Sequence, residues 1–287
     1  MAQSDRPTPG VLSLRQAIEE RAPDSSKGSL LGCWLVSGSV SVARAIASTQ
    51  KLDFIVIDAE HAPTDVRLVD DLIKAIRLCS LGRTAALVRL PSQAVEWIKW
   101  ALDAGANGII VPRIDSVQEA RQLVSNARYP PIGDRSFGPF SAPLAIPADA
   151  GSTTKGVLEY FTQEAPNVVV LPQIESRGGL EHVDEIIGLE GISGAFVGPV
   201  DLRLSIGLSP MPPALDKYEP TWSEAISRVM DAARKHGKVV GTVTDGTQQM
   251  IADISKLGFR FISTSTDLFA VAESVALSAT QARAASV

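Results

Sequence analysis

The sequence contains few of the residues that mark disulfide frameworks, zinc sites or nucleic-acid-binding surfaces. Among 287 residues there are only two cysteines and three histidines. Cys33 and Cys79 do not form a disulfide framework or a CxxC metal motif, so we expect both to be small buried apolar residues. The net charge of −5 argues against a basic nucleic-acid-binding surface.

Long apolar runs are also missing from the sequence. No run of about 18 apolar residues predicts a membrane-spanning helix. The first residues, MAQSDRPTPG, lack the charged-then-apolar profile of a signal peptide. We therefore expect a cytoplasmic enzyme or binding protein without nucleic-acid or membrane partners. Its length and 45% hydrophobic content suit one large α/β barrel or two smaller domains.

Short apolar runs alternate with longer amphipathic segments along most of the chain. The runs are rich in valine and isoleucine and do not alternate apolar with polar residues, which is typical of parallel strands buried on both faces. There are eight of them, at residues 30–36, 54–58, 85–90, 108–114, 167–174, 194–200, 238–243 and 259–264. With helical segments between them, they predict a (β/α)8 TIM barrel. An open doubly wound sheet is the alternative, but no GxGxxG turn follows the first run.

The sequence predicts one catalytic domain preceded by an arm. Residues 1–27 are expected to form an N-terminal arm and a capping helix, over residues 12–21, and residues 28–287 a single barrel domain. A long connection rich in glycine, proline and serine begins at residue 128. Because long loops in compact domains are usually functional or flexible, we expect an active-site loop there, followed by a short helix near residues 155–163.

Charged and polar residues follow the apolar runs where strands of a barrel would end. Asp58, Glu60 and His61 follow the second run, Arg89 ends the third, and Glu175 follows the fifth. The carboxyl ends of the strands meet at one face of a barrel. An unpaired charge beside a core strand is costly, so these residues either form buried ion pairs or line a polar pocket. Convergence of five strand ends favours the pocket.

Glu175 and Asp201 follow neighbouring runs and are candidates for a metal site. Adjacent parallel strands lie about 4.8 Å apart, so two such carboxylates can chelate one ion. Oxygen ligands select a hard cation such as Mg²⁺ or Mn²⁺. In the alternative, one carboxylate pairs with Arg89 and no metal binds.

The remaining charged residues suggest proton transfer and anion binding. His61 can exchange protons near neutral pH, and Asp58 could hold its ring in one tautomer. Arg89 suits a carboxylate or a developing enolate oxygen. The backbone N–H groups of Val200 and Asp201 could cradle a small carboxylate.

Several motifs occur together in an order that resembles the HpcH/HpaI aldolase family, class II pyruvate aldolases related to citrate lyase β subunits. The motifs are GCW, DAEHAP, VRLP, LDAGANGIIVP, RYPPIGDR, QIES and GPVDLRLSIG, between about residues 30 and 270. The resemblance implies a metal-dependent (β/α)8 barrel. Such an enzyme cleaves or forms 4-hydroxy-2-oxo acids through an enolate, giving pyruvate or a similar 2-oxo acid and an aldehyde.

The same resemblance implies roles for matching residues and a mode of assembly. Glu175 and Asp201 look like ligands of Mg²⁺ or Mn²⁺, with Co²⁺ as a further candidate. Arg89 resembles the arginine that stabilises the enolate, and His61 with Asp58 resembles a dyad that activates water for proton transfer. Substrate contacts are implied for Gln173, Gly198, Pro199, Val200 and Trp34. Relatives of this kind suggest a homo-oligomer, a trimer or hexamer, with a domain-swapped C-terminal helix.

Some positions depart from the family pattern. Ser136 replaces a glycine, Val200 an alanine and Arg203 a serine, and Arg113 stands where an apolar residue is commoner. The extra arginines either favour an acidic second substrate or form salt bridges at the rim. Beside the aldolase reaction, we keep decarboxylation of oxaloacetate or a similar acid, a citryl-CoA-type lyase and a non-catalytic binding barrel as alternatives. His182 and His236 are expected to be structural.

Overall fold

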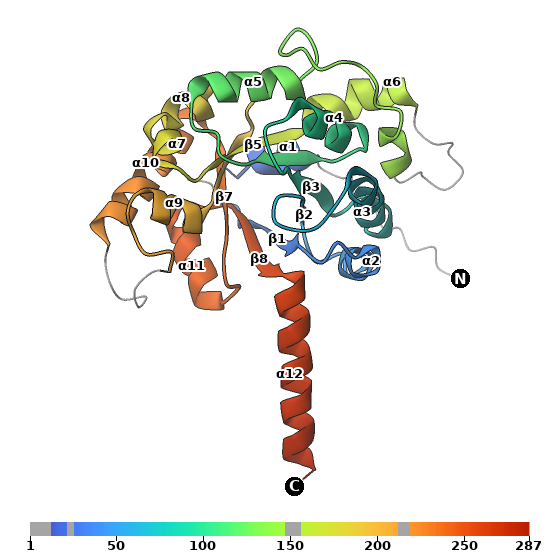
Figure 1. Ribbon diagram of the computed structural model, residues 1–287, viewed down its shortest axis with the longest axis vertical. Helices are drawn as coiled ribbons and strands as arrows, with labels where there is room; N and C mark the ends of the chain where they lie inside the picture. The colour runs from blue at the N-terminus through green and yellow to red at the C-terminus, as the bar shows by residue number, and fades with distance from the viewer. Residues whose placement is uncertain (1–12, 22–25, 147–155, 212–218, 287) are drawn as a thin grey trace.

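Eight parallel strands form a closed barrel, which confirms the predicted fold class (Figure 1). This computed structural model describes residues 13–21, 26–146, 156–211 and 219–286. Each strand pairs with the next along the chain, and β8 pairs with β1. The strands are β1 Leu30–Leu35, β2 Phe54–Asp58, β3 Ala85–Arg89, β4 Gly108–Val111, β5 Val169–Ile174, β6 Gly194–Val197, β7 Val239–Val243 and β8 Phe261–Thr266.

Helices follow the strands and surround the barrel (Figure 1). Between the strands lie α2 Val40–Ser48, α3 Val66–Cys79, α4 Val95–Asp103, α5 Val117–Ala127, α6 Val157–Glu159, α7 Arg177–Glu181, α8 Val183–Gly188, α9 Pro199–Ser205, α10 Pro220–His236 and α11 Gln248–Leu257. Local sequence fixes many ends. Ser39, Asp65 and Ser116 accept N-cap hydrogen bonds, and Gly237 ends α10 in the left-handed region at φ 63°.

The core has two layers because each strand is buried on both faces. One cluster packs between strands and helices, and a second fills the barrel interior. In the interior, the rings of Phe54 and Phe261 stack with centroids 3.7 Å apart. Gly32 leaves room for this stack, because a Cβ there would meet the Phe54 ring at 2.3 Å.

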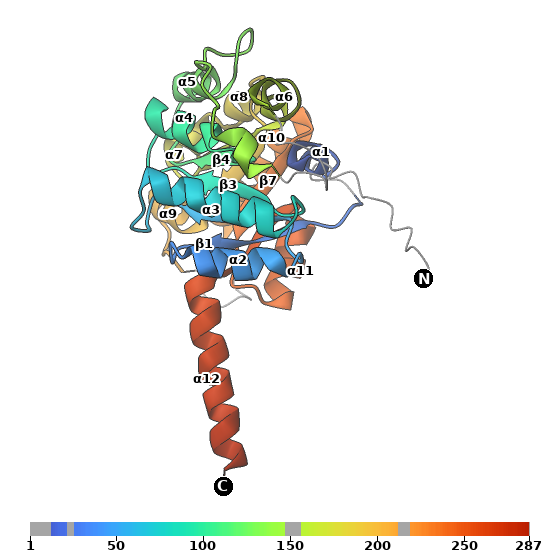
Figure 2. The same cartoon turned by 90° about the vertical axis from the view of Figure 1, so that its right-hand side faces the viewer.

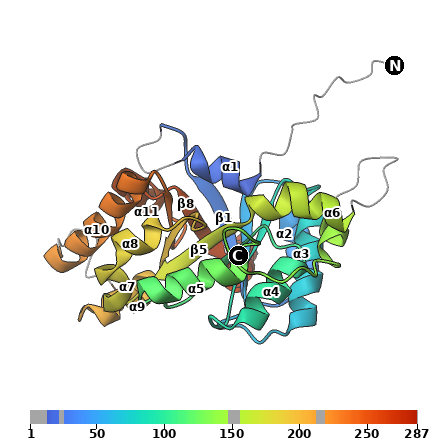
Figure 3. The same ribbon diagram turned by 90° about the horizontal axis from the view of Figure 1, so that it is seen from above.

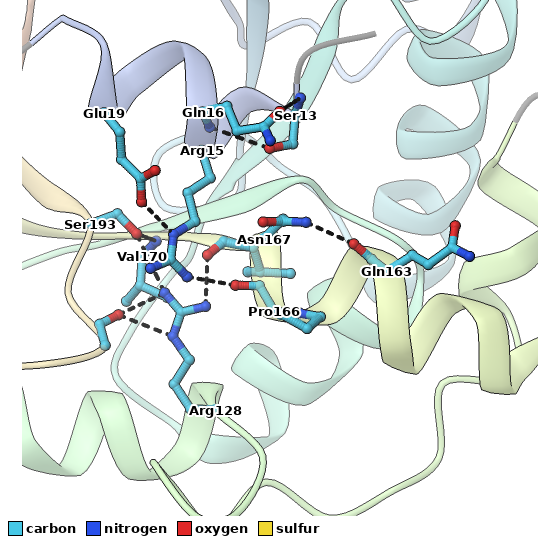
Figure 4. A network of polar contacts seen from close by, with 12 residues as sticks. Ser13, Arg15, Gln16, Glu19, Arg128, Gln163, Pro166, Asn167, Val170 and Ser193 are labelled. Atoms are coloured by element: carbon cyan, nitrogen blue, oxygen red, sulfur yellow. Dashed lines mark hydrogen bonds and ion pairs between the residues drawn. The ribbon is translucent and has the colours of Figure 1, made fainter. Parts of the chain in front are cut away.

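Helix α1, Leu14–Glu19, closes one end of the barrel (Figure 3), as the sequence predicts for residues 12–21. Its Leu14 and Ile18 side chains are buried with the interior cluster. Arg15 Nη1 donates to the carbonyl of Pro166 at 2.6 Å (Figure 4). Nearby, the buried Arg128 donates to the carbonyls of Val168 and Gly191, just outside β5 and β6. The Arg15 contact anchors α1 to the segment just before β5, and the Arg128 contacts join the residue after α5 to the starts of β5 and β6.

The long connection between α5 and β5 is fastened to the outer helices. Two 3-10 turns, Ala142–Ala145 and Ala165–Asn167, and a π turn, Tyr160–Glu164, accompany α6. The Tyr160 hydroxyl donates to the carbonyl of Leu102 at 3.0 Å. The expected short helix is present as α6 and the π turn. Residues 147–155 lie outside the described residues, and an active-site role for the connection stays a prediction.

Two strands end three residues earlier than the sequence predicts. The strand expected at 108–114 ends at Val111, and the one expected at 194–200 ends at Val197. The second ends because Pro199 takes the first position of α9, where its missing N–H and fixed φ favour a helix. Gly198, Pro199 and Val200 therefore lie at a strand-to-helix turn.

Helix α12, Asp267–Ala285, projects away from the barrel as a single rod (Figures 1 and 2). Asp267 fastens its base, because its carboxylate accepts the N–H groups of Val36 at 2.9 Å and Ser37 at 3.2 Å. From Leu268 to Ser286 every residue is exposed. Among the described residues, no helix is long and apolar enough to cross a membrane.

The Gly32 contact predicts a stability difference. Gly32→Ala should lower the free energy of unfolding by about 1–3 kcal/mol, because the new methyl group overpacks the Phe54–Phe261 stack. Gly28→Ala is the matched control, since a Cβ there has nothing within 4 Å. Chemical denaturation of both variants measures the difference, and equal stabilities would contradict the packing described for the interior.

Candidate active site

Arg89 is held at the carboxyl end of β3 by Asp58 on the neighbouring strand. The register of β2 and β3 places these two residues directly opposite one another. Arg89 Nε lies 2.9 Å from Asp58 Oδ1 and Nη2 lies 2.5 Å from Oδ2. Trp34 Nε1 donates to the same carboxylate at 3.2 Å, and the guanidinium lies 4.9 Å from the Trp34 ring centroid. The cation is therefore fixed by a two-pronged ion pair and an aromatic face.

The electrostatics of Asp58 agree with this geometry. The side chain is buried, and burial acts to raise the pKa of its carboxyl. The hydrogen bonds and charge of Arg89, with smaller contributions from the Glu60 N–H and Trp34, outweigh burial and hold the pKa below its usual value. The lowered pKa favours the carboxylate form of Asp58, which compensates the charge of Arg89.

The expected pairing of Asp58 with the His61 ring differs from the structure. Asp58 Oδ1 accepts the backbone N–H groups of Glu60 at 3.0 Å and His61 at 3.3 Å. Among the residues that the structure describes, the His61 ring approaches Glu60, with 3.9 Å between Nε2 and Oε2. The physical reason is the strand register, which turns the Asp58 carboxylate toward Arg89.

Glu60 lies between Arg89 and His61. Its Oε2 is 3.1 Å from Arg89 Nη1. Burial raises the pKa of Glu60, assisted by the charges of Asp58 and Asp201 and opposed by those of Arg89 and His61. Glu60 was expected at this strand end with Asp58 and His61, as a residue that hydrogen-bonds a loop or orients a water, but its contact with Arg89 was not predicted. Its spacing of two residues from Asp58 is the signal that could have placed it near the same cation.

Glu175 lies just beyond β5 as a buried acid, 4% exposed. Its Oε1 accepts the N–H of Arg113 at 2.8 Å, and its Oε2 accepts from Gln173 Nε2. Burial, assisted by the charges of Glu60 and Asp201, raises the pKa of Glu175 to about 7. Gly198 provides the space for this side chain, because a Cβ there would lie 2.5 Å from Glu175 Oε2.

Asp201 stands in the first turn of α9 and is exposed. Its charge acts on the carboxyls of both Glu60 and Glu175, so the three acids face one region. Val200 is 44% exposed beside it. Binding of a substrate carboxylate by the Gly198–Val200 turn stays a prediction.

The residues at this end of the barrel fit a divalent cation. A buried acid with a raised pKa, two further carboxylates and the Gln173 Oε1 atom, which is buried without a hydrogen-bond partner in the described structure, all favour a positive ligand. No three His, Cys, Asp or Glu side chains of the described residues are grouped to hold a metal by themselves. Mg²⁺ commonly takes only one or two protein carboxylates and completes its shell with water and substrate.

Residues 30–274 match the HpcH/HpaI aldolase/citrate lyase family. The chain belongs to this family. It is 32% identical over 245 residues to a hydroxypyruvate/pyruvate aldolase from Roseovarius nubinhibens, covering 85% of this chain and 88% of the relative. It is 32% identical over 240 residues to a 2-keto-3-deoxy-L-rhamnonate aldolase from Escherichia coli, covering 83% and 82%.

A solved structure supports the same relationship. Macrophomate synthase superposes with a TM-score of 0.81 at 34% identity, covering 95% of this chain and 90% of that chain. The protein is an aldolase of class II type, a carbon–carbon lyase, on the fold of its HpcH/HpaI relatives. The non-catalytic alternative is therefore set aside.

The two extra arginines of this HpcH/HpaI member differ in environment. Arg203 is buried, and its Nη1 lies 2.7 Å from Glu219 Oε2, so it forms a structural salt bridge. Arg113 has a largely exposed side chain, 3.8 Å from Asp115, and a positive φ of 50°. Ser136 is exposed on the long connection. Of these substituted positions, Arg113 is the one whose backbone N–H donates to Glu175.

The other two histidines lie among the outer helices. His236 Nε2 lies 3.0 Å from Asp184 Oδ1, and His182 Nδ1 lies 3.8 Å from Glu185 Oε2. His182 lies between α7 and α8, and His236 is the last residue of α10, so neither lies at the strand ends. These contacts agree with the structural roles expected for them.

The raised pKa of Glu175 predicts how stability depends on pH. In metal-free protein, the contribution of protonated Glu175 to the free energy of unfolding is fully present below pH 4.5. It is lost as the pH rises through about 7. Glu175→Gln removes this titration, so the variant should gain stability relative to wild type as pH rises. The rise in the pKa of Glu175 corresponds to roughly 3 kcal/mol in the free energy of unfolding.

Thermal unfolding in EDTA at about pH 5 and about pH 8.5 measures this difference. The exposed Glu224→Gln variant is the matched control and should show no such gain. A Glu175→Gln variant whose stability relative to wild type does not change between the two pH values would contradict the burial argument.

Proposed function

We propose that this protein is a divalent-metal-dependent aldolase that cleaves or forms a 4-hydroxy-2-oxo acid. The products of cleavage are pyruvate, or a similar 2-oxo acid, and an aldehyde. The observation that carries the proposal is the fixed Arg89 guanidinium, whose charge acts on the buried Glu175 at the end of the barrel where strand tips meet. The printed names of aldolase relatives support the reaction class.

The proposed chemistry assigns separate tasks to the charged residues. As the C3–C4 bond breaks, its electron pair moves onto C3 and into the 2-oxo group, giving an enolate. Arg89 carries a permanent positive charge and stabilises the developing oxygen anion. His61 activates a water that takes the proton of the C4 hydroxyl as the aldehyde forms. Protonation of C3 then completes the 2-oxo acid.

Glu175 and Asp201 are the residues proposed to hold the metal. A divalent cation held there, Mg²⁺ or Mn²⁺ with Co²⁺ as a further candidate, would act as a Lewis acid toward the 2-oxo group. It would also favour the ionised form of Glu175, whose burial otherwise opposes it. Gln173, Trp34 and the turn from Gly198 to Val200 are proposed to contact the 2-oxo acid.

We further propose that the protein is a homo-oligomer in which α12 packs on a second copy of this chain. Among the exposed residues of α12 are Leu268, Phe269, Val271, Val275 and Leu277. Surface patches of this kind in isolated chains mark interfaces. A rod that leaves its own barrel at Asp267 can bury these side chains only on another molecule (Figure 2).

The aldolase proposal predicts a metal-dependent release of pyruvate. Protein incubated with Mg²⁺ and a panel of 4-hydroxy-2-oxo acids should release pyruvate, detected with lactate dehydrogenase, and EDTA should abolish the release. Asp201→Asn and Arg89→Gln should each lower kcat/KM by at least about 100-fold. The exposed Asp231→Asn on α10 is the matched control and should retain activity.

Oxaloacetate is included in the panel to separate the two lyase reactions. Faster turnover of oxaloacetate than of every hydroxy-oxo acid would replace the aldolase proposal with a decarboxylase. No pyruvate release from any substrate, with metal shown to be bound, would contradict both.

The assembly proposal predicts a change in mass. Phe269→Ser with Val275→Ser should shift the protein toward smaller species in sedimentation velocity at the same concentration, because apolar contacts between copies are lost. Gln281→Ser on the same helix is the control. A monomeric wild-type protein would contradict the proposal.

A further inference from the structure

Three positively charged side chains meet at the amino ends of the strands, opposite the end that carries the candidate active site. Arg15 comes from α1, Arg128 follows α5, and Lys238 immediately precedes β7. The guanidinium groups of Arg15 and Arg128 face one another (Figure 4). The charge of Arg15 acts on both other groups, and that of Arg128 acts on Lys238. We call these three residues the basal cluster.

Backbone carbonyl groups hold the two more buried members of the basal cluster. Arg128 is 6% exposed, and its Nη1 and Nη2 donate to the carbonyls of Val168 at 2.7 Å and Gly191 at 2.6 Å. Lys238 is half-buried, and its Nζ donates to two carbonyls at the end of α8, at 2.6 Å and 2.8 Å. These contacts fix the cations in place, but a carbonyl group carries no net charge that would neutralise them.

The basal cluster has more positive than negative charge. Burial, with the charges of Arg15 and Arg128, lowers the pKa of Lys238 to about 8. Burial, with the charges of Arg15 and Arg135, lowers the pKa of Arg128 to about 10. Among the described residues, the one acid in contact with the cluster is Glu19, whose Oε1 lies 2.8 Å from Arg15 Nε. Three cations and one acid leave a net charge of +2, which favours the binding of an anion.

Arg15 and Lys238 keep hydrogen-bond donors for a ligand. Arg15 Nε donates to Glu19, and its Nη1 donates to the carbonyl of Pro166 at 2.6 Å. A guanidinium has five N–H groups, so three of those of Arg15 remain in the described structure. An ammonium group has three, and Lys238 uses two of them. The Arg15 side chain is 41% exposed, so an ion from solvent can reach these donors.

We propose that the basal cluster binds a small dianion, which is either one doubly charged oxyanion group or a pair of carboxylates. Its oxygens accept the remaining N–H groups of Arg15 and Lys238, and the planar guanidinium fork suits such oxygens. Arg128, whose donors are mostly taken by carbonyls, contributes its charge. A dianion cancels the net charge of +2 and joins α1 to the residue before β7. The site is independent of the aldolase reaction, because it lies at the other end of the barrel.

Isothermal titration calorimetry of the full chain with sodium sulfate tests this site. Metal is removed with a chelating resin, because EDTA is itself an anion, and the ionic strength is kept low and constant with chloride. Sulfate should bind the wild type with a Kd of about 1 mM or below. Arg15→Gln should weaken binding at least about 10-fold, because it removes donors and a charge. Glu19→Gln should strengthen binding about 3-fold or more, because it frees Arg15 Nε and removes a negative charge.

Arg44→Gln, which removes an exposed charge from α2, is the matched control and should bind sulfate as the wild type does. Malonate in place of sulfate separates the two ligand classes, since tighter binding identifies a dicarboxylate and weaker binding a tetrahedral oxyanion. None of the three substituted side chains is buried, so each variant should fold as the wild type does, which circular dichroism checks. A wild type that binds neither anion saturably, or an Arg15→Gln variant that binds them as tightly as the wild type, would overturn the proposal.

Discussion

The hydrogen bonding that closes the sheet between β1 and β8 is the constraint on which the rest of the structure depends. Closure makes every strand a central strand, so both faces must be apolar, and Phe54, Phe196 and Phe261 fill the interior. The charged side chains of the strands, Asp58 and Arg89, stand at the carboxyl ends of β2 and β3. The fold therefore gathers Asp58, Arg89 and Glu175, which are distant in sequence, at one end of the barrel.

The charged residues at that end fall into two groups, one with opposite charges in contact and one in which acids lie near other acids. Asp58 and Arg89 neutralise each other through two contacts and are held against Trp34. Glu175 has no cation of its own in the described structure, and burial beside other acids raises its pKa to about 7. The Asp58–Arg89 pair gives the site a fixed geometry. Glu175 and the acids near it favour binding of a cation, which the substrate would help to coordinate.

Much of the fold could be predicted because each strand carries its own signal. The eight apolar runs located all eight strands. The contacts between side chains were harder to predict, because they depend on strand register. The sequence places Asp58 three residues from His61, but the register sets Asp58 opposite Arg89, and the carboxylate pairs with that guanidinium in the structure. Arg203 and Arg113 looked alike in sequence, and only the fold shows that Glu219 neutralises the first.

Crystals grown with Mn²⁺ and oxalate, a stable mimic of the pyruvate enolate, test the central claim most directly. The account predicts one anomalous manganese peak coordinated by carboxylate oxygens of both Glu175 and Asp201, with oxalate on the metal and within reach of Arg89. A fully occupied manganese site elsewhere in the molecule, with Glu175 still buried and uncoordinated, would contradict it.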